Sequence, residues 1–383
     1  MRQSRSVIWI AVFLVWCISF SIPCFANAQE NAKTPLSIQN ALDIAYKNNP
    51  DILKTSLAVD KAQLNADNAA QAVTWIPNGG LVSSSYQQVM NNSQQANINL
   101  ILAKKANASE KDSITKEVIN AYTSALKSFN SIQIARDNLQ DMKQQMMINS
   151  LAKSIGITSD SDFAKMQIST KQLEETYNAA QLSYNSSIAT LRTLVGESDE
   201  WQPELTSTAA ITKYVRSDLT IEISRGISQS TSVYTKGAAL DIEKSKQQWV
   251  LPNISSDMQN INLSSAEIDY EQAKRSAHSS IEQLYYSIDS LEGQIQSYNN
   301  AYTQAQQDLQ TAQLKYDLGL IAKYSSASSS ASLASFQLAA EKARINLENS
   351  RGDLANLKAQ FGYLTGQTVY EAGDWVSDNP ANK

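Results

Sequence analysis

Residues 281–316 read IEQLYYSIDSLEGQIQSYNNAYTQAQQDLQTAQLKY, and this stretch decides the fold. Its apolar residues recur at alternating steps of three and four over five heptads: Ile281, Leu284, Ile288, Leu291, Ile295, Tyr298, Tyr302, Ala305, Leu309, Ala312 and Tyr316. A period of 3.5 residues keeps an apolar seam facing a partner helix along a supercoil. The seam stops at Tyr316-Asp317-Leu318-Gly319, and a new helical pattern starts beyond it. The sequence therefore predicts a long helical hairpin with its turn at Gly319.

The landmarks of this hairpin occur twice in the chain. The turn glycines Gly156 and Gly319 are 163 residues apart, and Gly196 and Gly366, which close the helices after each turn, are 170 apart. Trp75 with Pro77 similarly matches Trp249 with Pro252, and Trp201 and Trp375 follow the closing glycines. Repeats of this size indicate one architectural unit used twice. The predicted organisation is a signal peptide (1–28), a first repeat (29–200), a linker or equatorial segment (201–217), a second repeat (218–370) and a C-terminal tail (371–383).

The predicted helices are too long for a compact domain. Proline is absent between residues 78 and 202 and again between residues 253 and 378. At about 1.5 Å per residue, residues 263–318 as one helix would span roughly 85 Å. We therefore expect a mainly all-α, elongated molecule of antiparallel long-helix hairpins that forms a coiled coil or α-barrel, with β-strands short or absent.

The N-terminus has the pattern of a secretory signal peptide. Arg2 and Arg5 precede an apolar run over residues 7–20, and Ala26-Asn27-Ala28 offers a small-x-small cleavage site. An uncleaved anchor helix and a lipoprotein attached through Cys24 are the alternatives, although the run is short for a bilayer span. No later apolar run approaches that length, so we expect an exported protein of the cell envelope, in the outer membrane or periplasm.

The composition limits the partners and the chemical activities that the chain can have. Cys17 and Cys24 both lie in the signal, and removing Arg2 and Arg5 takes the net charge from −5 to −7, which argues against nucleic acid as a partner. His278 is the only histidine, so the sequence offers almost no residues for a metal cluster or for histidine-based catalysis. We expect no cofactor, no metal and no enzymatic activity.

Two acidic clusters have simple structural interpretations. Glu174-Glu175 fits a solvated helix face. Asp160 and Asp162 follow the Gly156 turn, where Ser159 or Asp160 is expected to cap the next helix. The alternative for Asp160 and Asp162 is a ring of carboxylates at the mouth of a pore, if the chain forms a symmetric oligomer.

The ordered motifs, taken together, resemble those of the outer-membrane efflux protein (TolC-like) family. They cover essentially the whole mature chain in two-repeat order: Ala41, Asn49-Pro50, Ile76-Pro77, Leu251-Pro252, Leu194-Val195-Gly196, Leu364-Thr365-Gly366 and the run Tyr316-Asp317-Leu318-Gly319-Leu320-Ile321. The resemblance implies a homotrimer that forms a tapered helical tunnel. It also implies that the turns dock a periplasmic adaptor (membrane fusion) protein linked to an inner-membrane pump. The docking residues carried over are Gly156, Ile157, Thr158, Tyr316, Gly319, Leu320 and Ile321.

The chain departs from the family pattern in two places. Residues 78–102 leave room for a membrane-associated segment with strands near residues 81–89 and 96–102, but residues 253–262 are too few for two spanning strands of about ten residues each. We therefore expect a reduced or absent β-barrel. Beyond the second turn, Ser325 and Ser328 stand where some members carry aspartates that line the tunnel entrance, so a tightly charged gate is not expected there.

The sequence is compatible with two main hypotheses about function. The first is a duct that exports small molecules or proteins through a polar lumen. The second is a barrel-less envelope or secreted coiled-coil protein that docks pump components without conducting. A pore-forming toxin would need a long apolar hairpin, which the chain lacks.

Overall fold

The computed structural model describes residues 34–73, 83–206, 216–247, 255–324 and 331–367. They form these elements, in chain order: β1 (Thr34–Leu36), α2 (Ile38–Asn48), α3 (Asp51–Gln71), α4 (Ser84–Ser154), α5 (Asp160–Val195), β2 (Pro203–Leu205), α6 (Leu219–Gln229), α7 (Thr231–Gln247), α8 (Ser256–Asp317) and α9 (Leu333–Thr365). The predicted signal peptide lies outside these residues, as do Pro77, Pro252 and Trp375.

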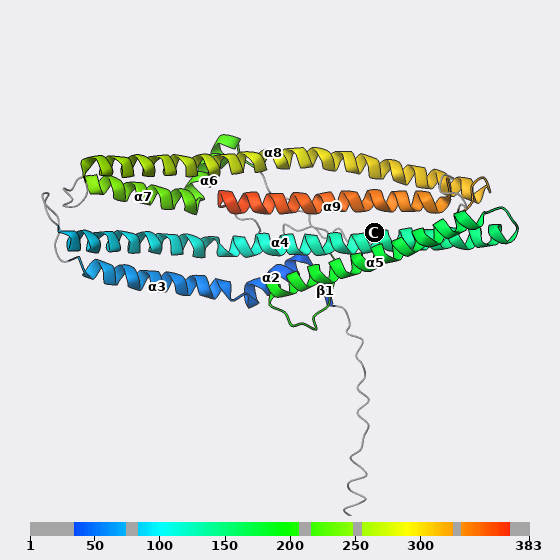
Figure 1. Ribbon diagram of the computed structural model, residues 1–383, viewed down its shortest axis with the longest axis horizontal. Coiled ribbons are helices and arrows are strands. Elements are labelled where there is room, and N and C mark those ends of the chain that lie inside the picture. Colours follow the sequence, from blue (N-terminus) through cyan, green and yellow to red (C-terminus); the bar gives the residue numbers. More distant parts are fainter. Residues whose placement is uncertain (1–33, 74–82, 207–215, 248–254, 325–330, 368–383) are drawn as a thin grey trace, which may run out of the picture.

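The molecule is an elongated rod built around two long helices, as the sequence predicts. Figure 1 shows α4 and α8 running along its length, with α3 and α5 end to end beside α4 and α7 and α9 end to end beside α8. The short helices α2 and α6 lie where those pairs meet, and we call this region the waist. The fold is therefore one helical unit used twice.

Matching contacts in the two halves show the repeat at atomic level. The Tyr122 hydroxyl donates to the Leu36 carbonyl at 3.0 Å, and the Tyr285 hydroxyl reaches the Ser217 carbonyl at 3.5 Å. Each tyrosine lies 34 residues before its turn glycine (122 to 156, 285 to 319). Each carbonyl belongs to the second residue before an eleven-residue waist helix. The two waists are thus assembled in the same way.

The apolar seam of residues 281–316 packs α8 against α9. Ile281, Ile288 and Ala312 are buried, and most other seam positions of α8 are half-buried, whereas Tyr298 and Tyr316 are more exposed. A larger buried cluster lies at the first waist, where Ile38 and Leu42 of α2 meet α4, α5 and α9. Burial of these apolar side chains is the main force that holds the long helices together.

The strands predicted near residues 81–89 and 96–102 are wrong in the described part, because α4 begins at Ser84 and is helical throughout this region. Amide side chains support the helix here: Gln88 donates to Asn92 at 2.9 Å and Gln95 to Asn99 at 3.0 Å, each pair four residues apart. Such pairs face each other on a helix and not on a strand. Residues 78–82 lie outside the described residues.

The second repeat begins with two helices, because α6 ends and α7 begins on either side of Ser230. One helix boundary also differs from expectation. The long helix expected to start near Leu263 begins at Ser256, and the Ser255 side chain caps it by accepting from the Met258 N–H. A serine can cap a helix whose first turns lack apolar periodicity, so the apolar pattern alone predicted the start of α8 too late.

The described strands are short, as predicted. β1 and β2 form a parallel pair with Pro35 opposite Glu204, and the Thr206 N–H donates to the Leu36 carbonyl at 3.1 Å. This pair ties the segment that follows α5 to the start of α2. Among the described helices, none is both long and apolar enough to cross a lipid bilayer.

Candidate functional site

The turn between α4 and α5, here the first tip, is set by a glycine in the left-handed conformation. Gly156 has φ of +79°, and its N–H donates to the Lys153 carbonyl at 3.0 Å. The Ile157 N–H reaches the Ala152 carbonyl at 2.9 Å. These bonds satisfy helix-end carbonyls that would otherwise lack partners. Below the turn, the Thr158 hydroxyl donates to the buried Asn149 side chain at 3.2 Å and so ties the turn to α4.

The turn that ends α8, here the second tip, repeats the same geometry. Gly319 has φ of +71°, its N–H donates to the Tyr316 carbonyl at 2.9 Å, and the Leu320 N–H donates to the Lys315 carbonyl at 2.8 Å. Each donor and acceptor is 163 residues from its counterpart in the first tip. The predicted turn glycines are therefore confirmed at both positions.

The path back to α9 differs from that of the first tip. Ile321 is half-buried beyond the second turn. The Leu333 N–H then donates to the Ala322 carbonyl at 3.1 Å, and the Ala334 N–H donates to the Lys323 carbonyl at 3.0 Å. The chain thus returns beside the turn before α9 begins. Ser325 and Ser328, the candidate entrance residues, lie outside the described residues.

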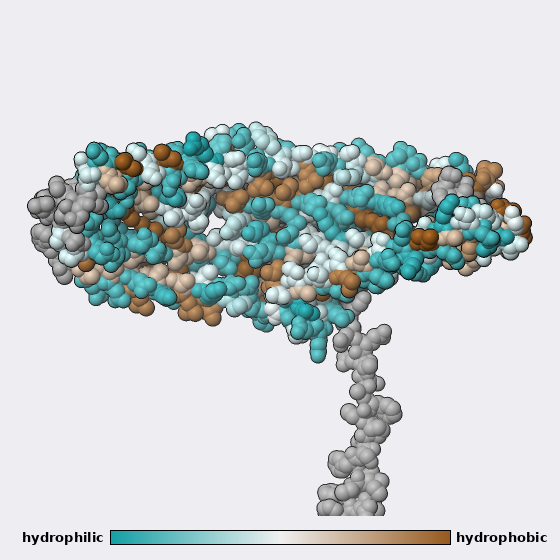
Figure 2. All heavy atoms as spheres, in the orientation of Figure 1, coloured by the Kyte–Doolittle hydropathy of each residue, from teal (hydrophilic) through white to brown (hydrophobic). Residues whose placement is uncertain are grey.

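Both tips lie at one end of the rod (Figure 1), and they present apolar side chains to solvent. Ile157 is 75% exposed and Leu320 is 70% exposed, and Tyr316 is exposed beside them. Figure 2 shows hydrophobic surface at this end, among hydrophilic and neutral side chains, as well as along the middle of the rod. Leu318 is similarly exposed and was not singled out from the sequence; its position off the α8 seam is the signal that could have found it. Exposed apolar groups concentrated in this way mark interaction surfaces.

Asp160 and Asp162 are each held by a basic side chain of the first tip. Asp160 pairs with Lys153 at 2.8 Å, and the hydrogen bond from that lysine lowers the pKa of Asp160. Asp162 accepts from the Ser159 hydroxyl at 2.8 Å and from Lys165 at 3.1 Å, and these two bonds lower the pKa of Asp162. Ser159 is the N-cap of α5, as one of the two predicted alternatives has it.

The part of the chain that the structure describes offers few residues suited to catalysis. No group of three or more His, Cys, Asp or Glu residues there is arranged to hold a metal ion. His278 lies on the exposed surface of α8, with Nδ1 3.6 Å from a carboxylate oxygen of Glu282 in the same helix. This pair is a surface contact between successive turns.

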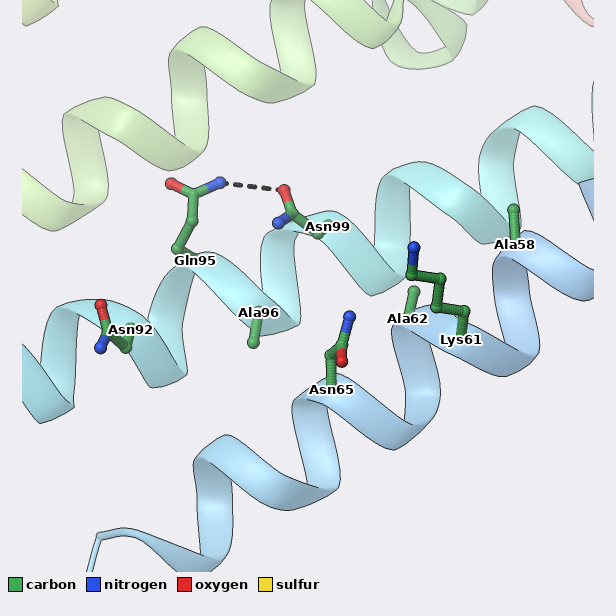
Figure 3. A pocket seen from close by; sticks show the side chains of 8 residues that line it. All are labelled: Ala58, Lys61, Ala62, Asn65, Asn92, Gln95, Ala96 and Asn99. Atoms are coloured by element: carbon green, nitrogen blue, oxygen red, sulfur yellow. Dashed lines mark hydrogen bonds between the residues drawn. The ribbon is translucent and has the colours of Figure 1, made fainter.

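Two hollows are lined by a mixture of polar and apolar side chains. Figure 3 shows the residues that line one of about 340 Å³ at α3 and α4: Asn65 of α3 points toward α4, whereas Gln95 and Asn99 lie on the side of α4 away from α3 and bond to each other. The other, of about 450 Å³, lies where α7 and α9 meet α4 and α8. Six serine and threonine side chains line it: Ser109, Ser230, Thr231, Ser232, Ser276 and Ser280. Both walls mix polar side chains with apolar ones, such as Ala62 and Ala96 in the first hollow and Ile281 and Leu364 in the second.

No known protein family matches the sequence, and no curated protein matches it either. The fold, however, is that of bacterial outer-membrane channels, which confirms the TolC-like fold expected from the motifs. The Campylobacter jejuni CmeC outer membrane channel aligns at 10% identity with a TM-score of 0.59, covering 90% of this chain and 88% of that one. A Pseudomonas aeruginosa membrane protein aligns at 12% identity, TM-score 0.57, over 86% and 92%. The Vibrio cholerae outer membrane protein VceC aligns at 14% identity, TM-score 0.53, over 87% and 97%.

Proposed function

We propose that this chain is the wall-forming subunit of an export duct in the bacterial envelope. The observation that carries the proposal is the fold shared along most of the chain with outer-membrane channels, together with two matching tips at one end. The proposed duct is a homotrimer with a water-filled lumen lined by Ser, Asn and Gln, which hands small molecules or proteins outward from an inner-membrane pump.

Assembly into a ring is supported by two apolar stripes on opposite edges of the rod. Figure 1 shows α3 and α8 on these edges, with α4 and α7 between them. The exposed stripe residues are Leu53, Leu57 and Leu64 on α3, and Met258, Ile261 and Ile268 on α8. Contact between two different surfaces of successive copies closes a ring when the rotation between copies allows it. Burying these stripes would remove large apolar side chains from water.

The tips are the proposed docking surface for the periplasmic adaptor. They offer Gly156, Ile157 and Thr158 in the first repeat and Tyr316, Gly319, Leu320 and Ile321 in the second. Their rigid backbone bonds hold the exposed Ile157 and Leu320 side chains in place for a partner with complementary apolar pockets. The pairing of Asp160 with Lys153 and of Asp162 with Lys165 favours a local structural role for both carboxylates at the start of α5 over a ring of free carboxylates.

A cross-linking experiment at the tips tests the proposal. A photoreactive amino acid at Leu320 should capture an envelope adaptor in cells, whereas one at Tyr286, which is also exposed but far from both tips, should not capture it. Purified protein should also conduct ions in planar bilayers. Adaptor capture without conductance would contradict the duct and favour the non-conducting docking protein. If neither adaptor capture nor conductance were observed, both hypotheses would be excluded.

A further inference from the structure

The first waist is covered by the chain segment that follows its closing glycine. After Gly196, the chain passes Trp201 and forms β2 beside β1. Trp201 and Leu205 pack against the buried cluster of this waist. Under this cover Ile38 is 1% exposed, and Leu42 and Tyr122 are 0% exposed. The returning segment thus completes the first waist.

The second waist has the same framework without that cover among the described residues. Leu219 and Ile223 are the first and fifth residues of α6, as Ile38 and Leu42 are of α2. Leu219, Ile223 and Tyr285 are only half-buried. Equivalent apolar positions are therefore sealed in one repeat and left partly open to water in the other.

The chain leaves the second repeat along the same route as the first. The Gln367 N–H donates to the Gly362 carbonyl at 3.0 Å, and in the first repeat the Glu197 N–H donates to the Arg192 carbonyl at 3.1 Å. Gln367 then binds Glu222 through its side-chain amide. Glu222 is fully buried on α6, so this bond directs the departing chain to the second waist.

We propose that residues 368–383 of the same chain bind across α6 and α8 at the second waist, as residues 197–205 bind at the first. Sixteen residues follow Gln367, and among them Trp375 is the counterpart of Trp201. An extended chain covers about 3.3 Å per residue, so the eight steps from Gln367 to Trp375 reach roughly 26 Å. The eleven residues of α6 span only about 16 Å. The tail is long enough to cross the helix.

The chemistry of the tail fits this surface. Val369, Tyr370, Trp375 and Val376 offer apolar groups to Leu219, Ile223 and Tyr285. The tail also carries Glu371, Asp374 and Asp378, and the partly exposed Arg225 side chain lies beside the buried Glu222. Binding of the tail does not depend on the duct function, and it would complete the second waist in a duct or in a structural protein alike.

Hydrogen exchange on the full mature chain and on a variant that ends at residue 367 tests the proposal, with the first waist as internal control. Loss of the tail should raise exchange severalfold in residues 216–223 and leave residues 38–45 unchanged. Unchanged exchange in both segments would overturn the proposal.

A disulfide experiment identifies the occupant. The mature chain has no cysteine, so Ser217→Cys can be paired with a cysteine at each position from 375 to 379. Ser228→Cys, on the opposite face of α6, is the matched control. We expect an intramolecular disulfide with Ser217→Cys at one or more tail positions and none with Ser228→Cys. Equal yields at both sites, or bonds formed only between two chains, would overturn the assignment to the chain's own tail.

Discussion

Replacing Gly226 with alanine tests how tightly the second waist is packed. Gly226 lies in α6, and a Cβ atom there would stand 1.8 Å from Cδ1 and 3.0 Å from Cγ1 of Ile281. Ile281 is buried in the α8–α9 core, so it must change rotamer or push α6 outward. Overpacking of this kind typically costs about 1–3 kcal/mol. Alanine in place of glycine within a helix returns about 0.5–1 kcal/mol. The free energy of unfolding should therefore fall by up to about 2.5 kcal/mol.

Two other helical glycines provide matched controls. A Cβ atom at Gly293 of α8 would meet nothing within 4 Å, and one at Gly352 of α9 would lie 3.5 Å from Thr123, an ordinary contact. Gly293→Ala and Gly352→Ala should each raise the free energy of unfolding by about 0.5–1 kcal/mol, because only the helix propensity changes. All variants are compared by urea denaturation followed by circular dichroism, at one protein concentration because assembly shifts apparent stability. If Gly226→Ala proved as stable as Gly293→Ala, the packing described at the second waist would be refuted.

Three further predictions concern the second tip, the ring edge and the second waist. Gly319→Val should strain the left-handed turn by at least about 1–2 kcal/mol and abolish adaptor cross-linking. Gly293→Val should leave cross-linking intact, and survival of cross-linking in Gly319→Val would exclude this turn as the docking surface. Leu57→Asp should shift the protein from trimer to monomer in sedimentation with unchanged helicity, and an intact trimer would show that the α3 edge is not an interface. Glu222→Gln should lower the free energy of unfolding by about 1–3 kcal/mol, because an amide cannot accept all the bonds that the buried carboxylate accepts from Ser217, Arg225 and Gln367; unchanged stability would contradict that network.

The sequence predicts the long hairpins well because their signals are local and repeated. The seam from Ile281 onward fixes the α8–α9 pairing, and Gly156 and Gly319 stand where only a left-handed residue closes the helix. Gly196 and Gly366 also end α5 and α9 in the left-handed conformation, as their closing positions suggest. These features need no knowledge of distant contacts.

The start of α4 could not be predicted in the same way. From residue 84 to residue 102 the chain is rich in Asn, Gln and Ser and has no continuous apolar stripe, so weak alternation imitates a strand. What stabilises the helix is contact with α3 and the amide pairs that begin at Gln88 and Gln95. Tertiary packing decides the structure here, and a single window of sequence does not contain it.

The contacts at the second waist could not be predicted from the sequence either. Glu222 looks like an ordinary helix-surface acid, yet it is fully buried because Ser217, Arg225 and Gln367 converge on it. Gln367 is 145 residues away along the chain, and no periodicity links the two positions. The docking role of the tips likewise stays a prediction, since it depends on a partner protein.

Electron microscopy of the purified mature protein, viewed down the long axis of the particles, tests the central proposal most directly. Three copies joined edge to edge through α3 and α8 should give a three-fold ring with an open centre and the six tips at one end. A single solid rod, or a closed bundle without a central opening, would contradict the proposed duct.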